Sequence, residues 1–187
     1  MSEKDAKISS PLLVAALVVL LIAGFALLPR LFKPRGGALD GKDAPNFTLE
    51  VVANINPSGE GKGTLTLSDL RGKPVLLDFW ATWCGPCAEE TPMIDKVAQR
   101  YKDRGLVVVG VNTSDAPNLA RPWVERRRIT FPIVFDASNE VAAGYGVDNL
   151  PTLVLVSRAG KVIAMRTGMT GDAELEALVK EALSAEL

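Results

Sequence analysis

The chain has 187 residues, of which 48% are hydrophobic, and a formal net charge of −1 at pH 7. This length and composition predict one domain of ordinary size plus an appendage, and the near-neutral charge predicts no nucleic-acid partner. Two cysteines are too few for a disulfide scaffold. Because the chain also has no histidine, a zinc or iron–sulfur site would need carboxylates or a second chain. Haem attachment of the c type is excluded because Ala88, not histidine, follows the second cysteine. We therefore expect no cofactor and no metal.

The first predicted element is a transmembrane helix at residues 11–30, after a polar N-terminal tail at residues 1–10. Residues 8–29 carry no charge and are mostly apolar, which is about the length that spans a bilayer. A buried core helix would show a polar face, which this segment lacks. A cleaved signal peptide should end in a small-x-small site, for which Gly24-Phe25-Ala26 is a weak candidate. We expect an uncleaved signal anchor.

The segment at residues 31–41 predicts a linker, because proline and glycine recur in it. It leads into a domain at residues 42–187. Two runs of alternating polarity at the start of this domain, residues 47–52 and 64–67, are typical of β-strands. The loop-like composition of residues 56–63 between them predicts a β-hairpin.

The two cysteines lie where a strand is predicted to meet a helix. Residues 75–80 are a short apolar run of strand formers, and residues 86–104 are predicted to be helical. A helix N-terminus carries unpaired N–H groups and a partial positive charge, so the pKa of Cys84 should be lowered. Pro86 suits the first helical turn. Cys84 can then attack a disulfide of another protein, and Cys87 can resolve the mixed disulfide.

The remainder of the chain alternates strands and helices. The continuous apolar run at residues 106–111 predicts a strand buried on both faces and paired in parallel with the strand before the cysteines. The pattern predicts a sheet with a mostly parallel centre, an antiparallel edge and helices on both faces, an α/β sandwich. The other predicted elements are a helix at 119–129, a strand at 132–135, a helix at 140–145, an antiparallel strand pair at 153–156 and 161–165, and a final helix with Asp172 as its N-cap.

Two sequence signatures resemble the thioredoxin fold. The first is residues 78–87, DFWATWCGPC, followed by Glu90-Thr91-Pro92, and the second is residues 145–152, YGVDNLPT. Gly160-Lys161-Val162 in the closing hairpin also fits. Over residues 42–187 the chain is similar to the membrane-anchored, extracytoplasmic thioredoxins of the TlpA/ResA type. This resemblance implies a thioredoxin fold, a central mixed β-sheet flanked by helices, with an N-terminal β-hairpin extension and one preceding transmembrane helix.

The resemblance also implies the roles of individual residues. Cys84 would be the attacking thiol and Cys87 the resolving thiol of a redox-active disulfide. Pro151, after Leu150, would be a cis proline that lines the groove where the substrate backbone docks. The supporting residues that the resemblance implies are Trp83 as a shield of the site, Gly85 and Pro86 between the cysteines, Asp78 as a buried acid below them and Glu90 as an acid near them.

Asp78 and Glu90 also have an interpretation from physical chemistry alone. Since histidine is absent, the proton acceptor for Cys87 must be a carboxylate, a lysine or water. Asp78 interrupts an apolar strand, and an acid buried in such surroundings has a raised pKa and can exchange protons near neutrality. Two alternatives stay open at this point: Asp78 faces solvent or caps a loop, and Glu90 is an ordinary exposed helix residue.

The function that we expect is reduction of disulfides in exported proteins, with apocytochromes c as candidate substrates and cytochrome c maturation as the setting. A membrane thiol or electron donor would have to re-reduce the pair in an oxidising compartment. The alternatives are a disulfide oxidase or isomerase, a redoxin-type peroxidase, which uses a Thr/Ser-x-x-Cys site, and a non-enzymatic copper-site assembly factor. A purely structural disulfide would stabilise little, because a two-residue loop closes almost no chain entropy.

The charges that flank the predicted anchor bear on its orientation. Lys4 and Lys7 precede it, and Arg30, Lys33 and Arg35 follow it, so the positive-inside rule slightly favours a cytoplasmic C-terminal domain. We expect the opposite orientation, with the domain on the periplasmic or extracytoplasmic side of the cell membrane. A short tail, a single span and a domain that needs a membrane-coupled thiol supply fit that side better.

Overall fold

The computed structural model describes residues 15, 18–20, 38–54 and 63–184. The chain divides into two units, residues 1–35 and residues 36–187. In the first unit Ala15 and residues 18–20 are helical. The predicted tail, the rest of the predicted anchor, most of the linker and nearly all of the hairpin loop lie outside the described residues. Within the part of the chain that is described, no helix has the length and apolar character needed to cross a membrane.

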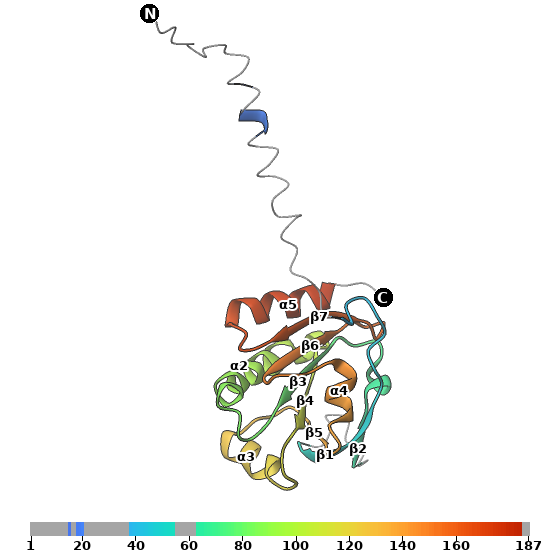
Figure 1. Ribbon diagram of the computed structural model, residues 1–187, viewed down its shortest axis with the longest axis vertical. Helices are drawn as coiled ribbons and strands as arrows, with labels where there is room; N and C mark the ends of the chain where they lie inside the picture. The colour runs from blue at the N-terminus through green and yellow to red at the C-terminus, as the bar shows by residue number, and fades with distance from the viewer. Residues whose placement is uncertain (1–14, 16–17, 21–37, 55–62, 185–187) are drawn as a thin grey trace, which may run out of the picture. The chain divides into compact units, whose positions relative to one another are not determined.

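The second unit is built on a seven-stranded mixed sheet with the strand order β2-β1-β5-β4-β3-β6-β7 (Figure 1). The three central strands β5, β4 and β3 run parallel, as predicted. Antiparallel strands flank this centre on both sides and not at one edge only, because β1 of the N-terminal hairpin returns to pair with β5. The strands are β1 Thr48–Ala53, β2 Thr64–Thr66, β3 Val75–Trp80, β4 Val107–Thr113, β5 Ile133–Asp136, β6 Thr152–Val156 and β7 Val162–Thr167.

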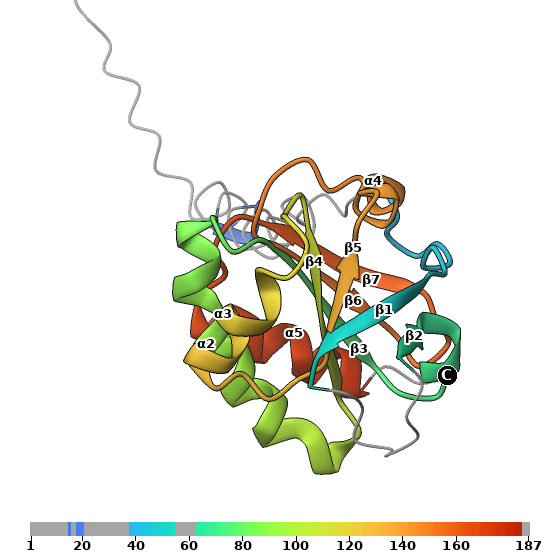
Figure 2. The ribbon, with the colours of Figure 1, turned by 90° about the horizontal axis from the view of Figure 1, so that it is seen from below.

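Helices cover both faces of this sheet. α2, α3 and α5 lie on one side and the short α4 lies on the other (Figure 2). Asp172 was predicted as the N-cap of α5 but is the first residue of that helix. The residue before it, Gly171, accepts the N–H of Leu175 with its carbonyl oxygen at 3.0 Å. The helices are η1 Leu67–Leu70, α2 Gly85–Tyr101, η2 Lys102–Arg104, α3 Ala120–Arg127, α4 Glu140–Tyr145 and α5 Asp172–Ser184.

The strand that leads to the cysteines, β3, is buried along its whole length. Its side chains alternate between the two faces of the sheet. Leu76 and Trp80 belong to the cluster under α2, α3 and α5, whereas Leu77 and Phe79 belong to the cluster under α4. The alternation therefore puts Asp78, between Leu76 and Trp80, on the face that α2 covers.

The helix after the cysteines, α2, packs through a stripe at helical spacing. Its buried side chains include Cys87, Glu90, Ile94, Val97 and Tyr101, whereas Met93, which the pattern assigned to the core, is half-buried. The helix is followed by one 3-10 turn and ends at Gly105, whose φ of 91° lies in the left-handed region that favours glycine. This packing holds the N-terminus of α2 at the carboxyl end of β3.

Candidate active site

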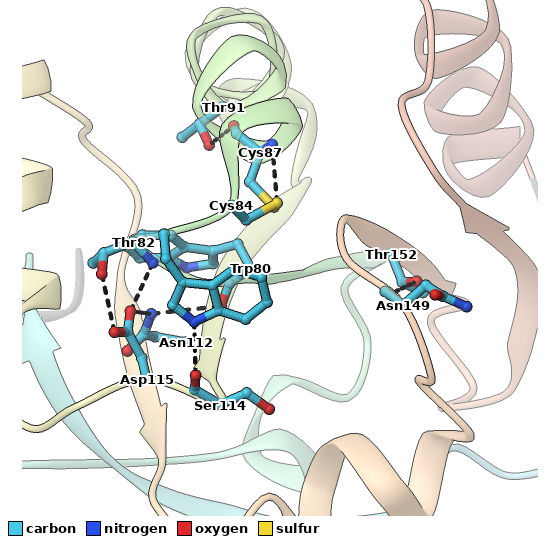
Figure 3. The surroundings of a disulfide bond; sticks show 11 residues. Trp80, Thr82, Cys84, Cys87, Thr91, Asn112, Ser114, Asp115, Asn149 and Thr152 are labelled. Atoms are coloured by element: carbon cyan, nitrogen blue, oxygen red, sulfur yellow. Dashed lines mark hydrogen bonds between the residues drawn. A yellow bond between two sulfur atoms is a disulfide. The ribbon is translucent and has the colours of Figure 1, made fainter.

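A disulfide joins Cys84 and Cys87 at the N-terminus of α2 (Figure 3). Cys84 occupies the N-cap position, and its Sγ accepts a hydrogen bond from the N–H of Cys87 at 3.2 Å. When the disulfide is reduced, the same N–H and the partial positive charge of the helix end would stabilise a thiolate on Cys84. This is the arrangement that the sequence predicted for the attacking thiol.

The two cysteines are not equally accessible. Cys84 is 4% exposed and Cys87 is 1% exposed. Thr91 lies one turn after Cys87 and its hydroxyl donates to the Cys87 carbonyl at 2.6 Å. Both cysteines are thus buried, with Cys84 slightly more exposed than Cys87.

Asp78 and Glu90 are both buried, each 1% exposed. The two alternatives left open by the sequence, a solvent-facing Asp78 and an exposed Glu90, are therefore wrong. Burial raises the pKa of Asp78 well above its ordinary value, and the charge of Glu90 raises it further. Burial also raises the pKa of Glu90, although the Thr170 N–H, which donates to Glu90 Oε1 at 2.7 Å, lowers it in part.

The two carboxyls come from the two elements that meet at the cysteine pair, Asp78 from β3 and Glu90 from α2, and they are close enough for their charges to interact. Glu90 follows Cys87 by three residues on α2, so the two side chains share a helix face. Asp78 Oδ2 and Glu90 Oε2 have no hydrogen-bond partner among the described residues. A buried carboxyl oxygen without a donor is better accommodated as a protonated group than as a carboxylate. The site thus holds two acids that can carry protons close to Cys87.

The cis proline that the resemblance implied is present, at Leu150–Pro151. Thr152, the next residue, begins β6 opposite Phe79 of β3, so Pro151 lies at the end of the sheet from which the chain runs to the cysteines. The Thr152 hydroxyl donates to the Asn149 carbonyl at 2.8 Å, which closes the turn around Pro151 (Figure 3). The Pro151 carbonyl accepts the Gly168 N–H at 2.8 Å, which ties this turn to the end of β7.

An acidic residue that the sequence reasoning did not single out, Asp115, holds the segment before the cysteines. Its carboxylate accepts the Thr82 N–H at 2.6 Å and the Thr82 hydroxyl at 2.9 Å (Figure 3). Partial burial alone would raise the pKa of Asp115, but hydrogen bonds from Asn112, Thr82 and the Ala116 N–H outweigh it and lower the pKa. A signal was present in the sequence: polar residues directly follow the buried strand β4.

The remaining predicted site residues are exposed. Trp83 is 66% exposed, and its indole N–H donates to the Ser114 carbonyl at 2.8 Å. Gly85 and Pro86 are exposed at the start of α2, and a Cβ on Gly85 would meet nothing within 4 Å. The backbone therefore does not require glycine at this position. As for metals, the described residues contain no group of three or more His, Cys, Asp or Glu that could hold an ion.

Comparisons with known proteins agree with this geometry. The family model described as AhpC/TSA family matches residues 41–165, which include both cysteines. Thiol-disulfide oxidoreductase ResA from Bacillus subtilis is 34% identical over 152 residues, 81% of this chain and 80% of that protein. ResA from Bacillus anthracis is 32% identical over 173 residues, 91% of this chain and 95% of that protein. A solved structure from Chlorobium tepidum, assigned as a thiol:disulfide interchange protein DsbE, matches with a TM-score of 0.69 and 33% identity over 78% of this chain and 98% of that chain.

Proposed function

We propose that this chain, which belongs to the AhpC/TSA family and is a thiol-disulfide oxidoreductase with ResA relatives, works as a membrane-tethered reductant of exported proteins. Residues 11–30 would anchor it in the cell membrane, with the thioredoxin-like domain on the periplasmic or extracytoplasmic side. Its substrates would be disulfides in exported proteins, with apocytochromes c as the leading candidates. A membrane thiol or electron donor would return the cysteine pair to the dithiol form.

The observation that carries the reducing direction is the buried pair Asp78 and Glu90 beside Cys87. A strong disulfide oxidant owes its strength to a stabilised reduced form. Here the helix N-terminus favours a thiolate on Cys84, but Cys87, Asp78 and Glu90 are buried in one apolar core, and burial disfavours a second negative charge there. The dithiol form of Cys84 and Cys87 therefore lacks the stabilisation that it has in a strong oxidant. A less stable dithiol form corresponds to a lower reduction potential, which supports a reductant.

The proposed reaction moves two electrons from the cysteine pair to the substrate. The Cys84 thiolate attacks a substrate disulfide, so a mixed disulfide forms and one substrate sulfur leaves as a thiolate that takes up a proton. Cys87 then gives its proton to an ionised buried carboxylate or to water and attacks Cys84 Sγ. The second substrate sulfur leaves as a thiol, and the Cys84–Cys87 disulfide remains.

The reduction potential tests this direction. The full chain, in detergent micelles, would be equilibrated with dithiothreitol redox buffers, and the fraction of the Cys84–Cys87 disulfide would be measured by thiol alkylation and mass spectrometry. A potential near or below about −230 mV, on the thioredoxin side of the known range, is the expected result. A potential near about −120 mV would make the pair a disulfide donor and remove the reductant proposal.

The anchor and its orientation need a separate test. Alkaline phosphatase depends on disulfides and becomes active only in an oxidising compartment. Fused after residue 41, it should be active in cells and sediment with membranes, whereas the same fusion without residues 11–30 should be inactive and soluble. An inactive, membrane-bound fusion would place the domain in the cytoplasm, as the flanking charges favour.

A further inference from the structure

A cavity of about 290 Å³ lies beside the active site. Its lining includes Trp83, the residue before Cys84, together with Asp148 and Leu150, the residue before cis-Pro151. We call it the Trp83–Asp148 cavity. This volume lies at the lower end of the range for small-molecule sites, about 300–1,000 Å³, so the cavity has room for an amino-acid side chain. Since Trp83 and Leu150 adjoin Cys84 and Pro151 in sequence, a residue that flanks a bound substrate cysteine would meet this cavity.

The walls of the Trp83–Asp148 cavity have defined chemistry. The Trp83 ring is 66% exposed and is held in place by the hydrogen bond from its indole N–H to the Ser114 carbonyl. Asp148 is exposed, and in the described portion of the chain it has neither an ion-pair partner nor a side-chain hydrogen bond. A cavity lined by an aromatic ring and by an unpaired carboxylate is a favourable environment for a cation, through cation–π and ionic attraction.

The charge around the cysteines points the same way. Lysine and arginine are absent from residues 74–95, 105–120 and 129–157. These three segments supply β3, the first part of α2, the loop after β4, α4 and cis-Pro151. A basic residue does occur on β7, the strand that pairs with β6. This residue, Arg166, forms an ion pair with Glu174 at 2.7 Å. The acidic residues of the three segments that are not buried are Glu89, Asp115, Glu140 and Asp148.

We propose that the Trp83–Asp148 cavity binds a lysine or arginine side chain next to the attacked cysteine, so the preferred substrates are disulfide proteins with a basic residue beside that cysteine. This inference rests on the proposed function, reduction of protein disulfides by Cys84 and Cys87. Asp148 then determines specificity and takes no part in the thiol chemistry. The aliphatic stem of the bound side chain would pack on Val147 and Leu150, with its charged head near Asp148.

The test uses disulfide-linked dimers of a short peptide in which lysine, norleucine or glutamate precedes the cysteine. The fully reduced full-length chain, in detergent micelles, would be mixed with each dimer, and the second-order rate of Cys84–Cys87 oxidation would be measured at low ionic strength. We expect the lysine peptide to react about tenfold faster than the glutamate peptide, with norleucine between them. Asp148→Asn should lower this ratio to about two, because the ionic part of the attraction is lost.

The matched control is Glu140→Gln, which removes an exposed acid of α4 that does not line the cavity. It should keep the wild-type ratio. Equal rates for the three peptides with the wild-type chain, or the same loss of discrimination in both variants, would overturn the proposal, since the preference would then come from the general field and not from the cavity. If the reduced chain reacts with none of the peptides, the proposed reductant function fails as well, so the two failures are distinguishable.

Discussion

Asp78 and Glu90 share the buried space beneath the N-terminus of α2, and they affect each other's protonation. Burial raises the pKa of Asp78, and the charge of Glu90 raises it further. The Thr170 N–H donates to Glu90 at 2.7 Å, and one oxygen of each carboxyl has no partner among the described residues. Because ionisation of one acid makes ionisation of the other less favourable, the titrations of Asp78 and Glu90 are coupled.

Replacing Asp78 by asparagine should stabilise the oxidised protein at neutral and alkaline pH. Because the pKa of Asp78 is raised in the folded state, the folded chain holds its proton more tightly than the unfolded chain. The contribution of Asp78 to stability is therefore fully present below the unfolded pKa of about 4 and is lost as pH rises through the folded pKa. We expect Asp78→Asn to be more stable than wild type by about 1–3 kcal/mol at pH 8 and by less at pH 4.

Urea unfolding of the oxidised full chain at both pH values would measure this difference. Asp69→Asn, at an exposed position in η1, is the matched control and should not change the pH dependence. A parallel pH dependence for wild type and Asp78→Asn would show that Asp78 does not carry the effect.

Replacing Glu90 by glutamine should slow disulfide reduction and change its pH profile. Glutamine keeps an oxygen to accept the Thr170 N–H but cannot take a proton from Cys87. We expect the rate to fall roughly 10²-fold, the lower end for loss of a general base, and the inflection due to Glu90 to disappear. Glu89→Gln, the exposed neighbour on α2, supplies the control. Identical profiles for the two variants would make Glu90 a bystander.

Replacing the cysteines one at a time should separate attack from resolution. Cys84→Ser should abolish disulfide reduction, whereas Cys87→Ser should still attack and then accumulate mixed disulfides with its partners. Non-reducing electrophoresis and mass spectrometry of membrane fractions would identify these adducts. Absence of adducts with Cys87→Ser, under conditions where wild type is active, would contradict the two-cysteine mechanism. Adducts that include apocytochrome c would support the proposed substrate class.

Removing the Asp115 carboxylate should loosen the segment that leads to Cys84. Asp115→Ala loses both hydrogen bonds from Thr82, and we expect a loss of about 1–3 kcal/mol in the free energy of unfolding at pH 7. Because the pKa of Asp115 is lowered on folding, this contribution is present above the unfolded pKa and is lost as pH falls through the folded pKa.

Thermal unfolding at pH 7 and pH 3 would therefore show a larger deficit for Asp115→Ala at pH 7 than at pH 3. The exposed residue Asp103 of η2 offers a control, since Asp103→Ala should behave as wild type at both pH values. An equal deficit at the two pH values would mean that the charge of Asp115 contributes nothing.

Local sequence determined the chemistry of this protein. A strand, a helix start and a turn depend on short-range propensity and periodicity, so neighbouring residues suffice to predict them. The features predicted in this way are the Cys84–Cys87 spacing, the apolar run of β3, the proline in the first turn of α2 and the alternating runs of the N-terminal hairpin. The redox pair at a strand–helix junction followed from these signals alone. The resemblance to thioredoxins added the cis proline, which no local pattern could have distinguished from a trans one.

Contacts between distant segments decided the rest. Glu90 lies on a helix where a glutamate is ordinarily exposed, and only the packing of α2 against the sheet and the Thr170 N–H, 80 residues away, bury it. The bonds from Thr82 to Asp115 span 33 residues. The pairing of β1 with β5, which puts antiparallel strands on both sides of the sheet, joins residues 80 to 85 positions apart. Such contacts arise from the way whole layers pack, which the pattern of any one segment does not specify. Tertiary structure alone therefore brought Trp83 and Asp148 into the lining of one cavity beside the disulfide.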